Sequence, residues 1–157
     1  MKPKVYIETT VISYLTARPS RDVVVAGHQE TTREWWRTCR DRFELIASQL
    51  VLGEASAGDP EFARRRLELL SELLLVGVTK ESSALAQDLI AAGAIPSKAA
   101  QDALHLGVAV TNGAAYLVTW NCKHLANAAL RIKIEEVCRS VGYEPVIICT
   151  PEELLED

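Results

Sequence analysis

The sequence lacks the features that define several protein classes. Its four cysteines, in a chain of 157 residues, form no CxxC pair and show no zinc-like spacing, which argues against a zinc module. No uninterrupted apolar stretch approaches the length of a membrane span, and no apolar signal region precedes the first expected strand. We therefore expect a cytoplasmic protein whose thiols are buried or half-buried in a reducing compartment: Cys39, Cys122, Cys138 and Cys149.

The chain also lacks an excess of positive charge. Its formal net charge is −4, which argues against a broadly basic nucleic-acid coat but allows a local basic rim around an acidic centre. Apolar residues make up 48% and charged residues 24%, as is ordinary for a soluble globular protein. Because no linker, repeat or low-complexity segment divides the sequence, we expect a single domain over residues 1–157.

Short apolar runs alternate with helical patterns along the whole chain. The runs predict strands at residues 4–7, 43–46, 74–78, 115–119 and 146–149. The patterns between them predict helices at residues 10–17, 21–40, from about 48 onward, 59–73, 80–92, 97–112 and 122–141, and a capping box at Thr150 that opens a terminal turn. This alternation predicts an α/β fold with three α/β/α layers around a mostly parallel central sheet.

Acidic and amide side chains fall at one edge of this predicted sheet. Glu8 ends the first strand and Asn121 follows the fourth, while Glu54 and Asp102 lie in the first two turns of predicted helices. Crossover helices start where the preceding strand finishes, so all four positions lie at the carboxyl edge, where open α/β sheets bind ligands. Because like charges repel at close range, the pattern predicts a divalent cation that holds the carboxylates together.

Each of these residues also has a simple structural interpretation. Glu8 alone is best explained as an acid stabilised by the N-terminus of the following helix, and Asp102 and Glu54 as solvated helix carboxylates. Their joint placement favours a shared site. A nucleotide-binding domain is disfavoured, because Glu8, Thr9 and Thr10 stand where a glycine-rich phosphate loop would follow the first strand.

Four segments of the chain resemble the motif regions of PIN-domain nucleases. Their order and spacing are most similar to those of VapC-type toxins from type II toxin–antitoxin pairs, and the resemblance covers essentially the whole chain. It rests on residues 6–12 (YIETTVI), Glu54, residues 102–105 (DALH) and residues 117–121 (LVTWN). The resemblance implies a metal-dependent endoribonuclease that uses Mg²⁺ or Mn²⁺ to cleave RNA, with a cognate antitoxin as partner and a homodimeric assembly.

The resemblance also implies roles for individual residues. Glu8, Glu54 and Asp102 match the family's acidic positions, and Thr9 and Thr119 match hydroxyls that support them. We assign Glu8 and Asp102 as direct or water-mediated metal ligands. Glu54 is assigned as a second-site ligand or as the residue that orients the attacking water.

Two positions depart from the family pattern. Glu8 stands where aspartate is usual, and Asn121 stands where a fourth aspartate is usual. An amide offers one carbonyl oxygen to a hard cation but no charge, so we expect weakened metal binding. We expect Asn121 and Thr119 to orient the carboxylates. The alternative is a PIN-like RNA- or protein-binding module whose catalysis is weakened.

Residues that follow the first and the fourth predicted strands are candidates for RNA contacts. We predict Lys123, Trp120 and Thr9 as such contacts, with Trp120 stacking on an unpaired base. His105, one helical turn after Asp102, is expected to be a half-buried helical histidine; the alternative is that it orients Asp102 or contacts RNA. The arginine clusters are expected to be solvated faces that pair with Glu34, Asp41 and Glu61.

Overall fold

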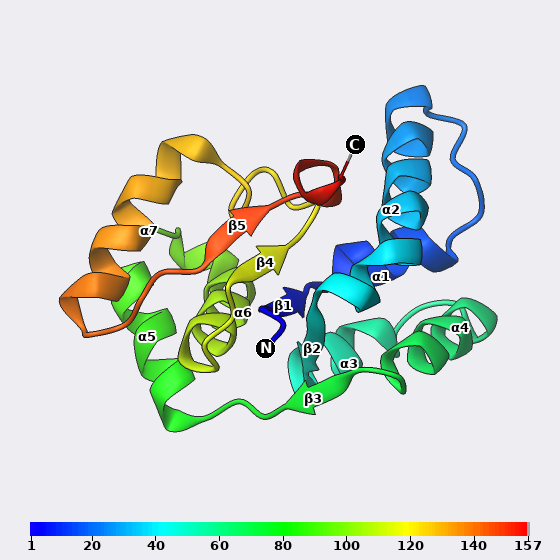
Figure 1. Cartoon of the computed structure of the whole chain (residues 1–157). Coiled ribbons are helices and arrows are strands. Elements are labelled where there is room, and N and C mark those ends of the chain that lie inside the picture. Colours follow the sequence, from blue (N-terminus) through cyan, green and yellow to red (C-terminus); the bar gives the residue numbers. More distant parts are fainter. Residues whose placement is uncertain (157) are drawn as a thin grey trace.

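The computed structural model describes residues 1–156 and contains a five-stranded sheet. The strands are β1 (Lys4–Ile7), β2 (Glu44–Ser48), β3 (Leu74–Val76), β4 (Tyr116–Val118) and β5 (Ile147–Cys149). Their order across the sheet is β3-β2-β1-β4-β5 (Figure 1). Every neighbouring pair is parallel, which confirms the predicted α/β class and its parallel sheet.

The order in which strands are added to the sheet reverses direction at β1. The chain places β2 and β3 on one side of β1 and then crosses to the other side for β4 and β5. Tyr6 of β1 is in register with Ile46 of β2 and with Leu117 of β4. The residues that follow β1 and β4 therefore lie at a topological switch point, which is where open α/β sheets bind ligands.

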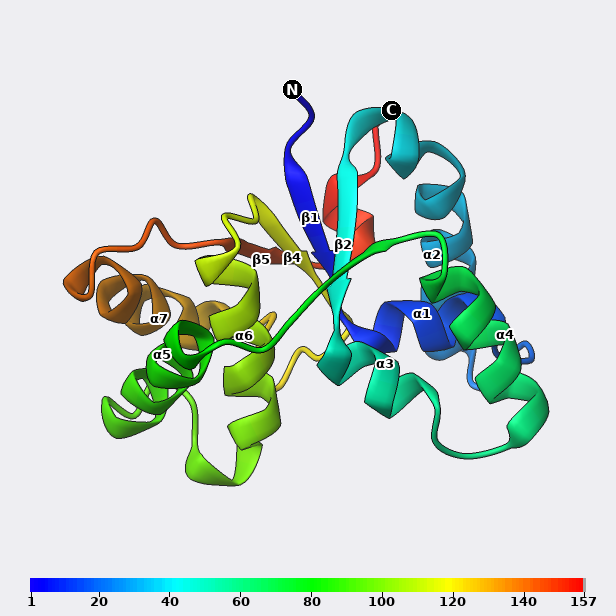
Figure 2. The same cartoon turned by 90° about the horizontal axis from the view of Figure 1, so that it is seen from below.

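Helices cover both faces of the sheet. In Figures 1 and 2, α5, α6 and α7 gather on one side and α1 to α4 on the other, which gives the three predicted layers. Within residues 1–156, no helix combines the length and apolar character that a bilayer crossing requires. The bounds are α1 (Thr9–Thr16), α2 (Val23–Arg42), α3 (Gln49–Ala55), α4 (Pro60–Leu70), α5 (Lys80–Ala91), α6 (Ala100–Thr111) and α7 (Ala128–Ser140), with 3₁₀ turns η1 (Ser97–Ala99) and η2 (Pro151–Leu154).

Polar caps determine where several helices begin. Side chains of Asp22, Ser48 and Asp59 accept backbone N–H groups at the starts of α2, α3 and α4. Pro60 occupies the first turn of α4, as the sequence predicts, since its missing N–H leaves no donor unsatisfied there. The start of α3 matters most for function, because it sets the position of Glu54 at the edge of the sheet.

The predicted helix at residues 122–141 is wrong in its first part. α7 starts only at Ala128, because the carbonyl oxygen of Asn121 accepts the N–H of Ala126 at 2.9 Å and closes a turn. Asn127 then caps α7 through its side chain. The segment after β4 is therefore a loop beside the sheet edge, and the residues expected on the first turns of a helix lie on that loop.

Several other boundaries differ from the prediction. α4 stops at Leu70, three residues before the predicted end, and β3 stops at Val76 instead of residue 78. The helix expected from residue 97 begins as the 3₁₀ turn η1. A turn follows Thr150 as expected, but the Thr150 side chain makes no cap hydrogen bond, so the capping box is wrong.

Helix α6 packs unusually closely against α5. A Cβ atom added to Gly107 would lie 2.3 Å from the carbonyl oxygen of Ser82, so only glycine fits at this crossing. Because α6 also carries Asp102 and His105, this close approach fixes their position relative to α5.

Candidate active site

Glu8 lies at the carboxyl end of β1, where it caps α1 and is only 5% exposed. Its Oε1 accepts the Thr10 backbone N–H at 3.2 Å and the hydroxyls of Thr10 and Thr119 at 2.5 and 2.6 Å. In the described part of the chain, no Lys or Arg pairs with Glu8, and its Oε2 accepts no hydrogen bond. The helix cap thus uses one carboxylate oxygen and leaves the other for a further partner.

Glu54 projects from α3 toward the same edge and is half-buried. Its Oε1 accepts hydrogen bonds from the Thr9 hydroxyl and from His105 Nε2, the latter over 2.8 Å. Burial raises the pKa of Glu54, but the hydrogen bonds that it accepts from His105 and Thr9 outweigh burial, so the pKa lies below its ordinary value. Glu54 is therefore a carboxylate at neutral pH.

His105 is 1% exposed, in contrast to the half-buried position predicted for it. Its Nδ1 lies 2.7 Å from the Tyr6 hydroxyl, which in turn lies 2.7 Å from Ser48 Oγ. Burial raises the pKa of Tyr6, so its hydroxyl keeps its proton. The described contacts of the His105 ring are to Glu54 and Tyr6, so the expectation that it orients Asp102 or contacts RNA is not supported.

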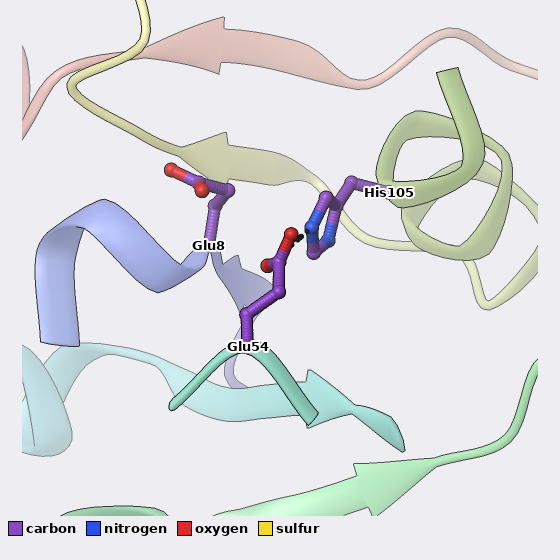
Figure 3. A group of neighbouring side chains, drawn as sticks. All are labelled: Glu8, Glu54 and His105. Carbon is purple, nitrogen blue, oxygen red and sulfur yellow. Dashed lines mark hydrogen bonds and ion pairs between the residues drawn. The ribbon is translucent and has the colours of Figure 1, made fainter. Parts of the chain in front are cut away.

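Three side chains from distant parts of the chain meet at this edge. One ligand atom each from Glu8, Glu54 and His105 lies within 4.8 Å of the other two. Figure 3 shows the three side chains. They come from the end of β1, from α3 and from α6. Two of the three were candidates from the sequence alone. His105 was missed as a member, although a tyrosine inside the apolar run of β1 signals a buried hydrogen-bond partner.

Asp102 lies outside this group of three. It is half-buried in the first turn of α6, one helical turn before His105. Within residues 1–156 it forms neither an ion pair nor a side-chain hydrogen bond. The third member of the close cluster is therefore His105, and not Asp102 as the sequence predicts.

Thr119 and Asn121 follow β4 and are linked to Glu8 by successive hydrogen bonds. The Thr119 hydroxyl, fully buried, donates to Glu8 and accepts the Asn121 backbone N–H at 2.9 Å. The Asn121 side-chain oxygen accepts the His124 N–H at 3.2 Å, which stabilises the turn after β4. Asn121 thus supports the carboxylate through its backbone and Thr119, while its amide carbonyl oxygen is engaged in the loop.

Trp120 is 9% exposed, which argues against its predicted role as a base-stacking platform. Its ring stacks on His28 with centroids 4.1 Å apart and also lies beside Tyr14 at 5.9 Å. The indole N–H donates to Thr32 at 2.8 Å. These contacts tie the loop after β4 to α1 and α2, so Trp120 acts as a structural anchor of the site edge.

The other predicted contact residues differ in accessibility. Lys123 is exposed on the loop after β4, whereas the hydroxyl of Thr9 is used by Glu54. Cys122, which precedes Lys123, is also exposed, so the expectation that all four thiols are buried or half-buried is wrong for Cys122.

Most arginines of the predicted basic faces form surface ion pairs. Glu61 pairs with Arg64 and Arg65, as expected. Glu34 and Asp41 do not appear in the ion pairs of residues 1–156, where the partners are Glu30, Glu68, Glu72 and Glu156.

Solved structures share this fold at low sequence identity. VapBC2 from Rickettsia felis, solved bound to a DNA fragment from its promoter, matches with a TM-score of 0.60 at 17% identity, covering 94% of this chain and 98% of the other. VapC20 from Mycobacterium tuberculosis, a sarcin-ricin loop cleaving toxin, matches with a TM-score of 0.54 at 14% identity, covering 76% and 92%. The chain therefore has the PIN-like α/β/α fold of VapC-type toxins.

No protein-family model matches the sequence, and no curated protein matches it. The likeness to the two toxins is therefore one of three-dimensional fold.

Proposed function

We propose that this protein is a metal-dependent endoribonuclease and the toxin of a toxin–antitoxin pair. The observation that carries the proposal is the convergence of Glu8 and Glu54 at the switch point of a fold shared with VapC-type toxins. Neither carboxylate is paired with a Lys or Arg of residues 1–156, so their negative charge is left for a cation.

The donor set fits a divalent metal ion. Carboxylate oxygens are the ligands that Mg²⁺ and Mn²⁺ prefer, and a site for Mg²⁺ needs only one or two of them beside water and substrate phosphate. Glu8 and Asp102 would hold the ion directly or through water. Glu54 would hold a second ion or orient the attacking water. Thr10 and Thr119 fix the Glu8 carboxylate by donating to Oε1, so that Oε2 keeps one direction.

The reaction follows from this arrangement. A bound Mg²⁺ or Mn²⁺ would supply positive charge that lowers the pKa of water and stabilises the departing oxygen of the RNA backbone. Water adds to the scissile phosphorus, the bridging P–O bond breaks, and the departing oxygen takes a proton. Glu54, ionised at neutral pH, can accept a hydrogen bond from that water.

Two further features are proposed for substrate and partner binding. Lys123 is exposed on the loop beside the site and is our candidate for an RNA phosphate contact, which positions the strand without reading its bases. The arginine cluster at Arg64, Arg65 and Arg66 on α4 is our candidate for binding an acidic antitoxin segment. We also propose a homodimer, as the VapC resemblance implies.

One observation favours a second function. Asn121 carries no charge, and its side-chain oxygen is engaged by His124. A PIN-like module that binds RNA or protein but cleaves poorly would have this weakened acidic edge. RNA binding without cleavage in the presence of Mn²⁺ distinguishes this second function from the first.

The purified protein should be incubated with total RNA in EDTA, in Mg²⁺ and in Mn²⁺, and the new 5′ ends mapped by sequencing. We expect discrete cleavage sites that require added metal and disappear in the Glu8→Gln, Glu54→Gln double variant. RNA that is retained in a gel-shift assay yet stays intact with either metal would support the binding module instead. Cleavage that persists in EDTA would overturn the metal-dependent mechanism.

A further inference from the structure

A chain of four polar side chains runs through the core and ends at Glu54. Ser48 Oγ, the Tyr6 hydroxyl and His105 Nδ1 are linked by two contacts of 2.7 Å, and His105 Nε2 lies 2.8 Å from Glu54 Oε1. The first three residues are 0 to 1% exposed, and only Glu54 reaches the surface. Burying polar groups is unfavourable unless each is hydrogen-bonded, and here each buried group has a partner in a chain that ends at one carboxylate.

The hydrogen-bonding capacities of these groups determine the direction of the chain. An ionised Glu54 only accepts, so His105 Nε2 must carry a proton and donate it. In the neutral imidazole Nδ1 is then an acceptor, and the Tyr6 hydroxyl donates to it. Ser48 Oγ accepts the Leu50 N–H at 3.2 Å and donates its own proton to Tyr6. Every group is satisfied in this arrangement, and it fixes one tautomer of His105.

The same chain determines how Glu54 meets a cation. Oε1 of Glu54 accepts from both the Thr9 hydroxyl and His105, so its acceptor capacity is used. The second carboxylate oxygen lies away from the imidazole in Figure 3. Two donors on one oxygen fix the carboxylate rotamer and leave the other oxygen for a metal ion or for water.

We propose that His105 is a positioning residue, which holds the Glu54 carboxylate in its metal-binding orientation while Tyr6 and Ser48 fix the His105 tautomer. This inference rests on the proposed function of the acidic site. It differs from a direct ligand role, in which His105 Nε2 itself would bind the ion and would no longer donate to Glu54.

Three variants separate these roles. Glutamine at position 105 (His105→Gln) can place an amide N–H where Nε2 stands and so restore the donor. His105→Leu removes the donor at similar volume. Tyr6→Phe keeps the ring in the core and removes only the hydroxyl that fixes the tautomer. For each variant, the Mn²⁺ dissociation constant is measured by titration calorimetry, kcat and KM are measured on RNA, and melting temperature checks the fold.

We expect His105→Leu to weaken Mn²⁺ binding by about 10- to 100-fold, the range typical for lost outer-shell partners. The loss should appear in kcat more than in the KM for RNA. Tyr6→Phe should show a smaller loss in the same direction, and His105→Gln should stay within a few-fold of the parent. A merely structural role would lower the melting temperature without this order of metal affinities.

Each other result overturns the inference. If His105→Gln is as defective as His105→Leu, His105 acts as a ligand or in proton transfer and not by positioning. If His105→Leu fails to fold, Tyr6→Phe decides, and unchanged Mn²⁺ affinity and kcat there would refute the positioning role. If the parent protein binds no Mn²⁺, the proposed function itself is refuted. If the parent binds Mn²⁺ and folded His105→Leu binds it equally tightly, only this inference is refuted.

Discussion

His105 Nε2 lies 2.8 Å from Glu54 Oε1, although the two residues are 51 positions apart in the sequence. Glu54 lies on α3, which follows β2 directly, and His105 lies on α6, which leads into β4. Their contact links the core of the protein, through Tyr6, to the carboxylate that reaches solvent. Hydrogen bonds from neighbouring side chains therefore fix the orientation of the Glu8 and Glu54 carboxylates.

Asp102 lies outside the close cluster of Glu8, Glu54 and His105, and its substitution tests whether it holds the metal ion. If it holds the ion through water, Asp102→Asn should reduce metal-dependent cleavage by at least about 10-fold while the fold survives. Relief of repulsion between carboxylates should leave the metal-free melting temperature unchanged or higher. Asp88→Asn on the exposed face of α5 is the matched control. Equal cleavage by parent and Asp102→Asn would remove Asp102 from the site.

Asn121→Asp tests the weakened fourth position. The new carboxylate can still accept the His124 N–H, so the turn should persist. Its charge should tighten Mn²⁺ binding and destabilise the metal-free protein, so that the melting temperature depends more strongly on Mn²⁺. Calorimetry and thermal melts with and without Mn²⁺ measure both effects. A variant with unaltered affinity and identical melts would show that this side chain does not face the acidic edge.

The four cysteines should differ sharply in reactivity. Cys122 is exposed, whereas burial raises the pKa of Cys39 and Cys138 to about 11 and that of Cys149 to about 12. At pH 8 these three groups stay protonated and covered, and the thiolate is the reactive form. We expect one thiol to react rapidly with Ellman's reagent in the native protein and all four in urea. Cys122→Ser should abolish the fast phase, and two or more fast thiols would contradict the burial.

Gly107→Ala tests the close packing of α5 and α6. The added methyl group would collide with the Ser82 carbonyl oxygen, so we expect a loss of about 1–3 kcal/mol in the free energy of unfolding. The control is Gly27→Ala in α2, where nothing lies within 4 Å, and where alanine should stabilise the helix by up to about 1 kcal/mol. Urea unfolding measures both. Equal stability of Gly107→Ala and the parent would show that the helices can separate at no cost.

The fold follows from sequence patterns because the central strands β1, β2 and β4 are largely buried. Runs such as residues 4–7 read as continuous apolar segments, and the rule that ligands bind at carboxyl ends brings Glu8 and Glu54 to one edge. What the sequence could not supply is the partner of a buried polar group. The buried position of Tyr6 indicates that its hydroxyl has a partner, but only the three-dimensional packing identifies that partner as His105.

Loop residues were the least predictable. The helical pattern over residues 122–141 is genuine from Ala128 onward, yet local hydrogen bonds to Asn121 win over helix propensity before that point. Trp120 looked like an exposed loop aromatic because its neighbours in sequence are polar. Its stacking partner, His28, is contributed by a distant helix, so its burial depends on tertiary packing.

The central claim is that Glu8 and Glu54 form a metal-dependent catalytic centre, and single-turnover cleavage of an RNA in Mn²⁺ tests it most directly. The parent should be compared with Glu8→Gln, Glu54→Gln and the control Glu136→Gln, which changes an exposed carboxylate on α7. We predict that each of the first two loses more than about 100-fold in rate, beyond the range typical of outer-shell changes, while Glu136→Gln cleaves like the parent. Cleavage by correctly folded Glu8→Gln and Glu54→Gln at the parent's rate would contradict the account.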